Sequence, residues 1–215
     1  MANEILGFIG PMGGGKSYQL EEARKRAADS GRAFLTGDFS DGIRETVLQI
    51  FGVSNNGAVL EPSDKNYLDW KEMEGSIRFP DVKGNTTCFG YKYRDLLKNV
   101  GEYMKKLAGE NVWARWTTLS VYRQYWGGTS ELRRNCDIVF GSVRFEAEVK
   151  EIYGLAESIN RSVKFIFCNH NKTAYNPDAH ISERLAHTLI KRGYTDGDDV
   201  TPAIRDIYRE EVFYR

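Results

Sequence analysis

The feature that most constrains this chain is a glycine-rich stretch near the start of the sequence. Residues 10–17 read GPMGGGKS and fit the pattern GxxxxGK[ST]. The apolar run Ile5 to Ile9 comes directly before it, as in a strand buried on both faces of a sheet. Ser17 to Asp29 follows and consists of strong helix formers. This order of strand, loop and helix is the one in which the pattern binds phosphate.

Each residue type in this loop has a physical role. Gly13, Gly14 and Gly15 allow the backbone to wrap a phosphate closely with its N–H groups. Lys16 supplies a positive charge for β- and γ-phosphates, and Ser17 can ligate Mg²⁺. The alternative is a glycine turn before an ordinary exposed lysine, and the position between a strand and a helix argues against it. The reaction stays open, since ATPases, GTPases and small-molecule kinases share the motif.

The remaining periodicity predicts a single α/β domain over residues 1–215, with a parallel sheet and helices on both of its faces. A polar stretch at about 53–87 is predicted to be an insertion. Further strands are expected at 32–36, 136–143 and 163–168, and further helices at 43–51, 93–107, 111–125, 145–155, 182–191 and from 201.

Composition limits the compartment and the partners. The 215 residues include 30 Lys and Arg and 30 Asp and Glu, so the net charge is zero and we do not expect nucleic acid binding. The cysteines Cys88, Cys136 and Cys168 are widely spaced, which predicts neither a zinc site nor a disulfide framework. No apolar segment reaches membrane length. We therefore expect a cytoplasmic protein without membrane contact.

Several charged residues follow the predicted strands, where α/β proteins bind ligands. Arg144 follows the strand 136–143, and Glu148 lies four residues further on. They could bind a phosphate, a base or a sugar hydroxyl, or they could form a plain ion pair. Ser142 stands where many ATPases and GTPases carry a Mg²⁺-binding aspartate, which weakens those two interpretations. Asp38 could serve the metal instead, or could be a turn or cap residue.

The chain resembles the bacteriophage deoxynucleoside monophosphate kinases, which carry a P-loop. Besides the loop, four segments match in the family's order: 39–44 (FSDGIR, similar to F-A-D-P-L-K), 93–101 with Trp113 (similar to R-x-L-L-Q-x-x-G-T…W), 143–148 (VRFEAE, similar to D-V-R-F-x-x-E) and 180–183 (HISE, similar to H-x-S-E). The resemblance covers roughly residues 5–185. It implies a three-layer α/β P-loop kinase fold and transfer of the ATP γ-phosphoryl group to a deoxynucleoside monophosphate (dNMP).

The resemblance also implies roles for individual residues. Gly13 to Ser17 would bind ATP with Mg²⁺ held by Ser17, and Lys16 and Arg144 would be catalytic. The implied acceptor site comprises Arg44, Arg94, Gly101, Trp113, Arg144 and Glu148. Trp113 could instead be a core residue. His180 and Glu183 would shape a loop over the ATP site, although Ser182 could simply begin a helix.

Two departures from the family leave alternatives open. Ser142 replaces an aspartate, and Glu102 replaces a threonine. A second hypothesis is a kinase that phosphorylates a hydroxymethylpyrimidine within phage DNA, against which the balanced charge argues. A third is a nucleotide-binding protein with weakened catalysis, against which Lys16 and Ser17 argue. The base accepted, the source organism and the formation of a homodimer stay undecided.

Overall fold

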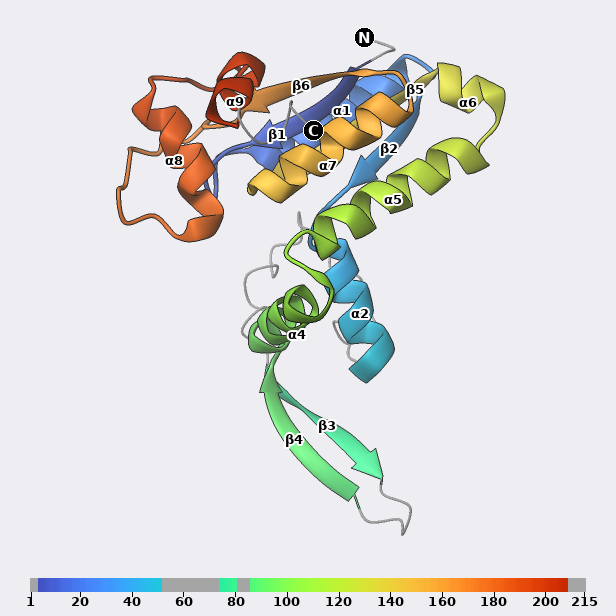
Figure 1. Cartoon of the computed structure of the whole chain (residues 1–215), viewed down its shortest axis with the longest axis vertical. Coiled ribbons are helices and arrows are strands. Elements are labelled where there is room, and N and C mark those ends of the chain that lie inside the picture. Colours follow the sequence, from blue (N-terminus) through green and yellow to red (C-terminus); the bar gives the residue numbers. More distant parts are fainter. Residues whose placement is uncertain (1–3, 52–73, 81–85, 209–215) are drawn as a thin grey trace. The chain divides into compact units, whose positions relative to one another are not determined.

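The computed structural model describes residues 4–51, 74–80 and 86–208 of the chain (Figure 1). The chain divides into two compact units, one formed by residues 1–39 with 114–215 and the other by residues 40–113. The insertion expected at 53–87 falls within the second unit, and residues 52–73 and 81–85 of it lie outside the described residues. Each unit is described separately below.

The first unit is built on a four-stranded, all-parallel sheet with the order β2-β5-β1-β6. The strands are β1 (Glu4–Ile9), β2 (Ala33–Gly37), β5 (Cys136–Val143) and β6 (Ser162–Phe167). These strands are largely apolar because helices cover the sheet on both faces. The prediction of an α/β fold with a parallel sheet is confirmed.

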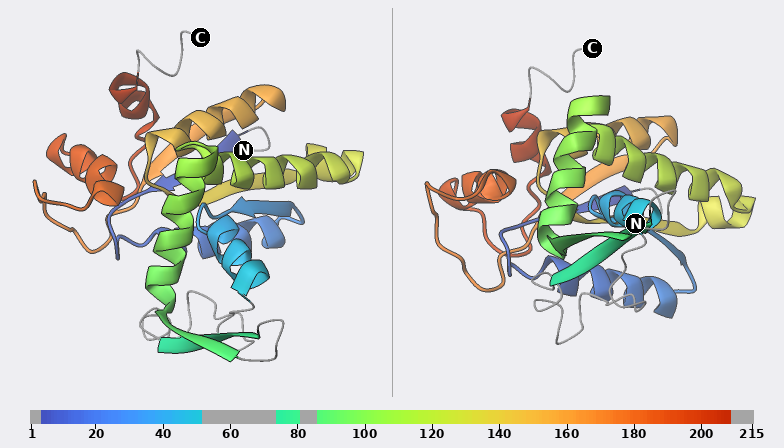
Figure 2. Two further views of the ribbon diagram at one scale, coloured as in Figure 1. Left: turned by 60° about the horizontal axis from the view of Figure 1, so that its bottom comes forward. Right: turned by 90° about the horizontal axis from the view of Figure 1, so that it is seen from below.

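Side-chain alternation along β1 separates two hydrophobic layers. Phe8 faces α1 (Lys16–Asp29), where Leu20 and Ala23 pack. Ile5 and Ile9 belong to the larger core on the opposite face. That core includes buried residues of α5 (Val112–Gly127), α7 (Glu146–Ser158), α8 (Arg184–Lys191) and α9 (Thr201–Ile207). Figure 2 shows α1 on one side of the sheet and α7 on the other, an arrangement compatible with a three-layer α/β fold.

The two crossovers that carry α1 and α7 run in opposite directions across the sheet. From β1 the chain passes through α1 to β2, and from β5 it passes through α7 to β6. Crossovers of one hand that run in opposite directions place their helices on opposite faces. The sequence order therefore reverses between β1 and β5, and α/β proteins bind ligands at the carboxyl ends of strands at such a point.

The second unit contains α2 (Asp41–Phe51), the antiparallel hairpin of β3 (Glu74–Pro80) and β4 (Thr86–Lys92), and α4 (Tyr93–Ala108). Helix α2 packs against α4, with Val47 and Tyr93 buried. Strand β3 and the first two residues of β4 lie inside the segment 53–87, which the sequence indicated only as a polar insertion, and β4 continues beyond it to Lys92.

The predicted helices and strands are found within a few residues of their expected bounds. The short helix α6 (Ser130–Arg134) and the 3-10 helix η1 (Ile181–Glu183) were not predicted as separate elements. Cys136 and Cys168 are buried and free. Among the described residues, no helix has both the length and the apolar character needed to cross a bilayer.

Candidate functional site

The glycine-rich loop connects β1 to α1 with a backbone that requires glycine. Gly13 and Gly15 have φ angles of 74° and 92°, in the left-handed region that other residues rarely adopt. A Cβ atom on Gly14 would lie 2.5 Å from the carbonyl oxygen of Cys168. Gly15 is the N-cap of α1, and no side chain of the described residues caps this helix. The first N–H groups of α1 are therefore suited to bind an anion.

Residues that follow β6 hold this loop. The Cys168 N–H donates to the Ile9 carbonyl at 2.7 Å, and the His170 N–H donates to the Gly14 carbonyl at 3.1 Å. The Asn171 side-chain amide donates to the Gly13 carbonyl at 2.7 Å. Sequence reasoning missed these residues, although a polar run directly after the strand 163–168 was a usable signal. Because β1 and β6 are parallel neighbours, the two loops emerge at one edge of the sheet.

The Lys16 ammonium lies over the same loop. Its Nζ donates to the carbonyl oxygens of Gly10 and Pro11, at 2.6 and 2.7 Å. Burial lowers the pKa of Lys16 to about 8, and the positive charge of Arg144 acts in the same direction. The carboxylate of Glu183 is among the groups that raise the pKa. The charges of Arg144 and Glu183 therefore both act on the Lys16 ammonium.

Three candidate residues lie at or after the end of β5. Ser142 is the penultimate residue of the strand, Arg144 follows the strand, and Glu148 lies in the first turn of α7. The Arg144 Nε–H donates to Ser142 Oγ at 3.0 Å. Glu148 Oε2 accepts the N–H of Arg144 at 2.5 Å and that of Phe145 at 3.0 Å, so this carboxylate caps α7. The sequence suggested a possible ion pair between Arg144 and Glu148, and the structure instead joins them through the main chain.

Glu148 is buried, with 7% of its surface exposed. Burial raises its pKa to about 7 against the effect of the two N–H donors, and the charge of Asp38 also raises it. Asp38 follows β2, and its carbonyl accepts the Thr117 hydroxyl at 3.4 Å. The structure thus brings the carboxylates of Asp38 and Glu148 within electrostatic reach of each other.

The other predicted acceptor residues belong to the second unit. Trp113 is buried, and its Nε1–H donates to the Gly101 carbonyl at 3.0 Å. The Arg44 guanidinium pairs with Asp41 at 3.2 Å, and Arg94 is exposed at the start of α4. Trp113 therefore has a packing role within its unit, and the substrate roles of all four residues stay predictions.

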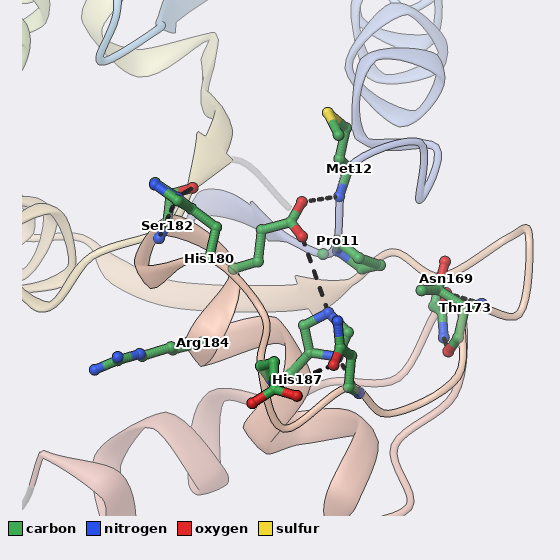
Figure 3. Close-up of polar contacts among 12 residues, drawn as sticks. Pro11, Met12, Asn169, Thr173, His180, Ser182, Arg184 and His187 are labelled. Atoms are coloured by element: carbon green, nitrogen blue, oxygen red, sulfur yellow. Dashed lines mark hydrogen bonds and ion pairs between the residues drawn. The ribbon is translucent and has the colours of Figure 1, made fainter. Parts of the chain in front are cut away.

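His180 and Glu183 lie at the two ends of the η1 turn, His180 as its N-cap and Glu183 as its last residue. The imidazole Nδ1 of His180 accepts the N–H of Ser182 at 3.3 Å. Glu183 Oε1 accepts the Met12 N–H of the glycine-rich loop at 2.7 Å (Figure 3). Ser182 lies in η1 directly before α8, so the prediction of a helix near it is confirmed, and Glu183 in addition contacts the loop.

Comparison with known proteins does not assign the chain to a family. No family model matches it, and neither the curated proteins nor the solved structures that were compared give a match. Its function is therefore inferred from the geometry of the site and from the motif resemblance.

Proposed function

We propose that this chain is a P-loop kinase that transfers the γ-phosphoryl group of Mg·ATP to a dNMP and releases the corresponding diphosphate. The observation that supports it best is that Lys16, after β1, and Arg144, after β5, lie at one edge of the sheet, near enough for the arginine charge to lower the pKa of Lys16. Two cations at one sheet edge suit a reaction in which negative charge spreads over a phosphoryl group. The choice of a dNMP as acceptor comes from the motif resemblance alone.

The residues present fit a nucleotide polyphosphate. The uncapped start of α1 and the left-handed Gly13 and Gly15 provide backbone N–H groups without side chains in the way. Ser17, in the first turn of α1, and Asp38, after β2, are the proposed Mg²⁺ residues. The described residues contain no group of three or more His, Cys, Asp or Glu side chains that could hold a metal by themselves. Ser17 and Asp38 would therefore hold Mg²⁺ together with the phosphate oxygens of the nucleotide, and the ion would supply positive charge against the phosphates.

The chain's own side chains would then divide the work of positioning. Lys16 would exchange its bonds to the Gly10 and Pro11 carbonyls for phosphate oxygens. Arg144 would bind a phosphate while Ser142 holds its Nε. Glu148 would fix the turn that carries Arg144 by accepting the two N–H groups at the start of α7. Positioning and charge stabilisation supply most of the catalysis in phosphoryl transfer, so no strong general base is required.

The direct test is to incubate the protein with Mg·ATP and each of the four dNMPs and to measure ADP together with the diphosphate product. ADP formed only with a dNMP supports the proposal. ADP formed only with DNA that contains hydroxymethylpyrimidine favours the second hypothesis. Tight binding of ATP without any turnover favours the nucleotide-binding protein.

Calorimetry separates the two halves of the proposed site. Arg144→Ala should weaken dNMP binding more than binding of a non-hydrolysable ATP analogue, because the resemblance assigns Arg144 to the acceptor. Loss of analogue binding with intact dNMP binding would show that Arg144 serves the ATP side. The cytoplasmic location and the phage origin belong to the same proposal.

A further inference from the structure

Glu183 contacts the glycine-rich loop from a distant part of the sequence. Its Oε1 accepts the Met12 N–H at 2.7 Å, across 171 residues of sequence. Its second carboxylate oxygen, Oε2, lies 3.9 Å from Nε2 of His187. The dashed lines in Figure 3 mark both contacts. One carboxylate therefore joins the loop to α8.

The imidazole of His187 faces the Glu183 carboxylate with its Nε2 atom. Its side chain is buried, and its Nδ1 accepts the N–H of Asn176 at 3.1 Å. Because Nδ1 acts as an acceptor, the neutral ring carries its proton on Nε2, the nitrogen that faces Glu183. The ring of Tyr175 packs edge-on against His187 at 6.3 Å between centroids. The Asn176 N–H and the Tyr175 ring thus hold the imidazole in the orientation in which Nε2 faces Glu183.

The backbone around Glu183 is also held. The Glu183 N–H donates to the His180 carbonyl at 2.7 Å and closes the η1 turn. Two residues further on, Leu185 begins the buried face of α8, which continues with Ala186 and Leu189. Glu183 therefore extends from a segment that the hydrophobic core anchors.

Met12 has no comparable anchor of its own. Its side chain is 81% exposed and contributes nothing to the core. Its neighbour Gly13 adopts the left-handed conformation and has no side chain that could restrict the backbone of the loop. Met12 precedes the stretch Gly13 to Ser17, so its bond to Glu183 uses none of the N–H groups of that stretch, of which the Gly14 N–H donates to the Pro11 carbonyl at 3.0 Å.

We infer that Glu183 is a positioning residue, oriented by His187, that orders the glycine-rich loop for phosphate binding. The loop is then shaped by α8 as well as by its own glycines and the residues that follow β6, and phosphate affinity depends in part on a segment near the end of the described chain. The link to phosphate rests on the proposed function, whereas the ordering of the loop does not.

The first measurement is amide exchange of the ligand-free protein by NMR, at Met12 and Gly13 to Gly15. Glu183→Ala should accelerate amide exchange at Met12 about tenfold, because it removes the hydrogen bond that the Met12 N–H donates to a charged group. Glu183→Gln keeps an oxygen that accepts the Met12 N–H, but its NH2 would face the Nε2–H of His187, so exchange should rise by less than in Glu183→Ala. Glu157→Gln, at an exposed position on α7, is the matched control and should change nothing. Unchanged exchange in Glu183→Ala would overturn the inference.

The second measurement is calorimetric titration of the same variants with a non-hydrolysable ATP analogue. We expect affinity about tenfold lower for Glu183→Ala, and a smaller loss for Glu183→Gln, which keeps the bond to Met12 but not the acceptor that faces His187. Tighter binding in both variants would overturn the positioning role, because it would mean that the carboxylate repels phosphate. A wild type that binds no analogue would refute the proposed function, and the exchange measurement would still decide whether Glu183 orders the loop.

Discussion

Glu148 accepts the backbone N–H of Arg144 at 2.5 Å, so the carboxylate fixes the main chain of the arginine while the guanidinium bonds to Ser142. Spacing of four residues usually suggests a side-chain ion pair on a helix surface. Here Arg144 precedes the first turn of α7, where N–H groups lack helical acceptors. The carboxylate is thereby buried, whereas Arg144 is exposed.

Replacement of Glu148 by Gln should change the pH dependence of stability. Burial raises the pKa of Glu148 to about 7 from a value of 4.5, so the folded protein holds a proton that the unfolded chain releases between these values. The wild type therefore loses stability as pH rises from 4.5 to 7, by about 3 kcal/mol, and Glu148→Gln does not. Urea unfolding at pH 5 and pH 7.5 measures this difference, with Glu157→Gln as control. A Glu148→Gln effect that is equal at both pH values would contradict it.

Lys16→Met should abolish phosphoryl transfer in a protein that stays folded. The ammonium lies on the loop over the Gly10 and Pro11 carbonyls and takes no part in the hydrophobic core. We expect kcat to fall by a factor on the order of 10² or more. Near-normal activity in folded Lys16→Met would refute the kinase assignment at this loop. Lys25→Ala, at an exposed position on the same helix, is the control and should keep full activity.

Wild-type activity should decline in alkaline solution. The lowered pKa of Lys16, about 8, means that its charge is present below that pH and is lost as the pH rises through it. The value of kcat/KM for ATP reports groups of the free enzyme, so it should fall above about pH 8. The same decline in Lys16→Arg, which stays charged throughout this range, would show that another group titrates.

Gly101→Ala separates a structural role from a substrate role for this residue. The added Cβ would lie 3.4 Å from Ile43 Cδ1 and 3.9 Å from Trp113 Nε1, which are acceptable contacts. Because Gly101 lies within α4, alanine should raise the free energy of unfolding by up to about 1 kcal/mol. If the acceptor approaches Gly101, KM for the dNMP rises while the variant remains stable. Thermal unfolding and steady-state kinetics on one preparation test both statements, and a destabilised variant would show that the helix needs glycine here.

Ser142→Asp should reorder the acceptors. The serine hydroxyl now accepts the Arg144 Nε–H at 3.0 Å, and a carboxylate would strengthen that bond and add a negative charge. We expect the ranking of dGMP, dTMP, dCMP and dAMP by kcat/KM to change more than KM for ATP. Ser142→Ala, which removes the acceptor without adding charge, is the paired control. Equal scaling of all four acceptors would show that position 142 does not read the base.

The local elements could be predicted because each depends on residues close in sequence. The strand at Ile5 to Ile9, the glycine loop and α1 follow from an apolar run, backbone freedom and helix propensity. The hairpin of β3 and β4 was missed among turn-forming residues, although apolar residues alternate along both strands, Ile77 with Phe79 and Phe89 with Tyr91.

The sequence alone determined the glycine-rich loop and the α/β class, since motif order and hydrophobic periodicity are properties of neighbouring residues. Only the tertiary structure decided which distant residues meet the loop. The strand order sets β1 between β5 and β6, and this brings Arg144 and His170 to the same sheet edge. Packing of α8 into the core then directs Glu183 to Met12. Contacts across 171 residues carry no local pattern, because they arise from the burial of whole elements and not from the spacing of their residues.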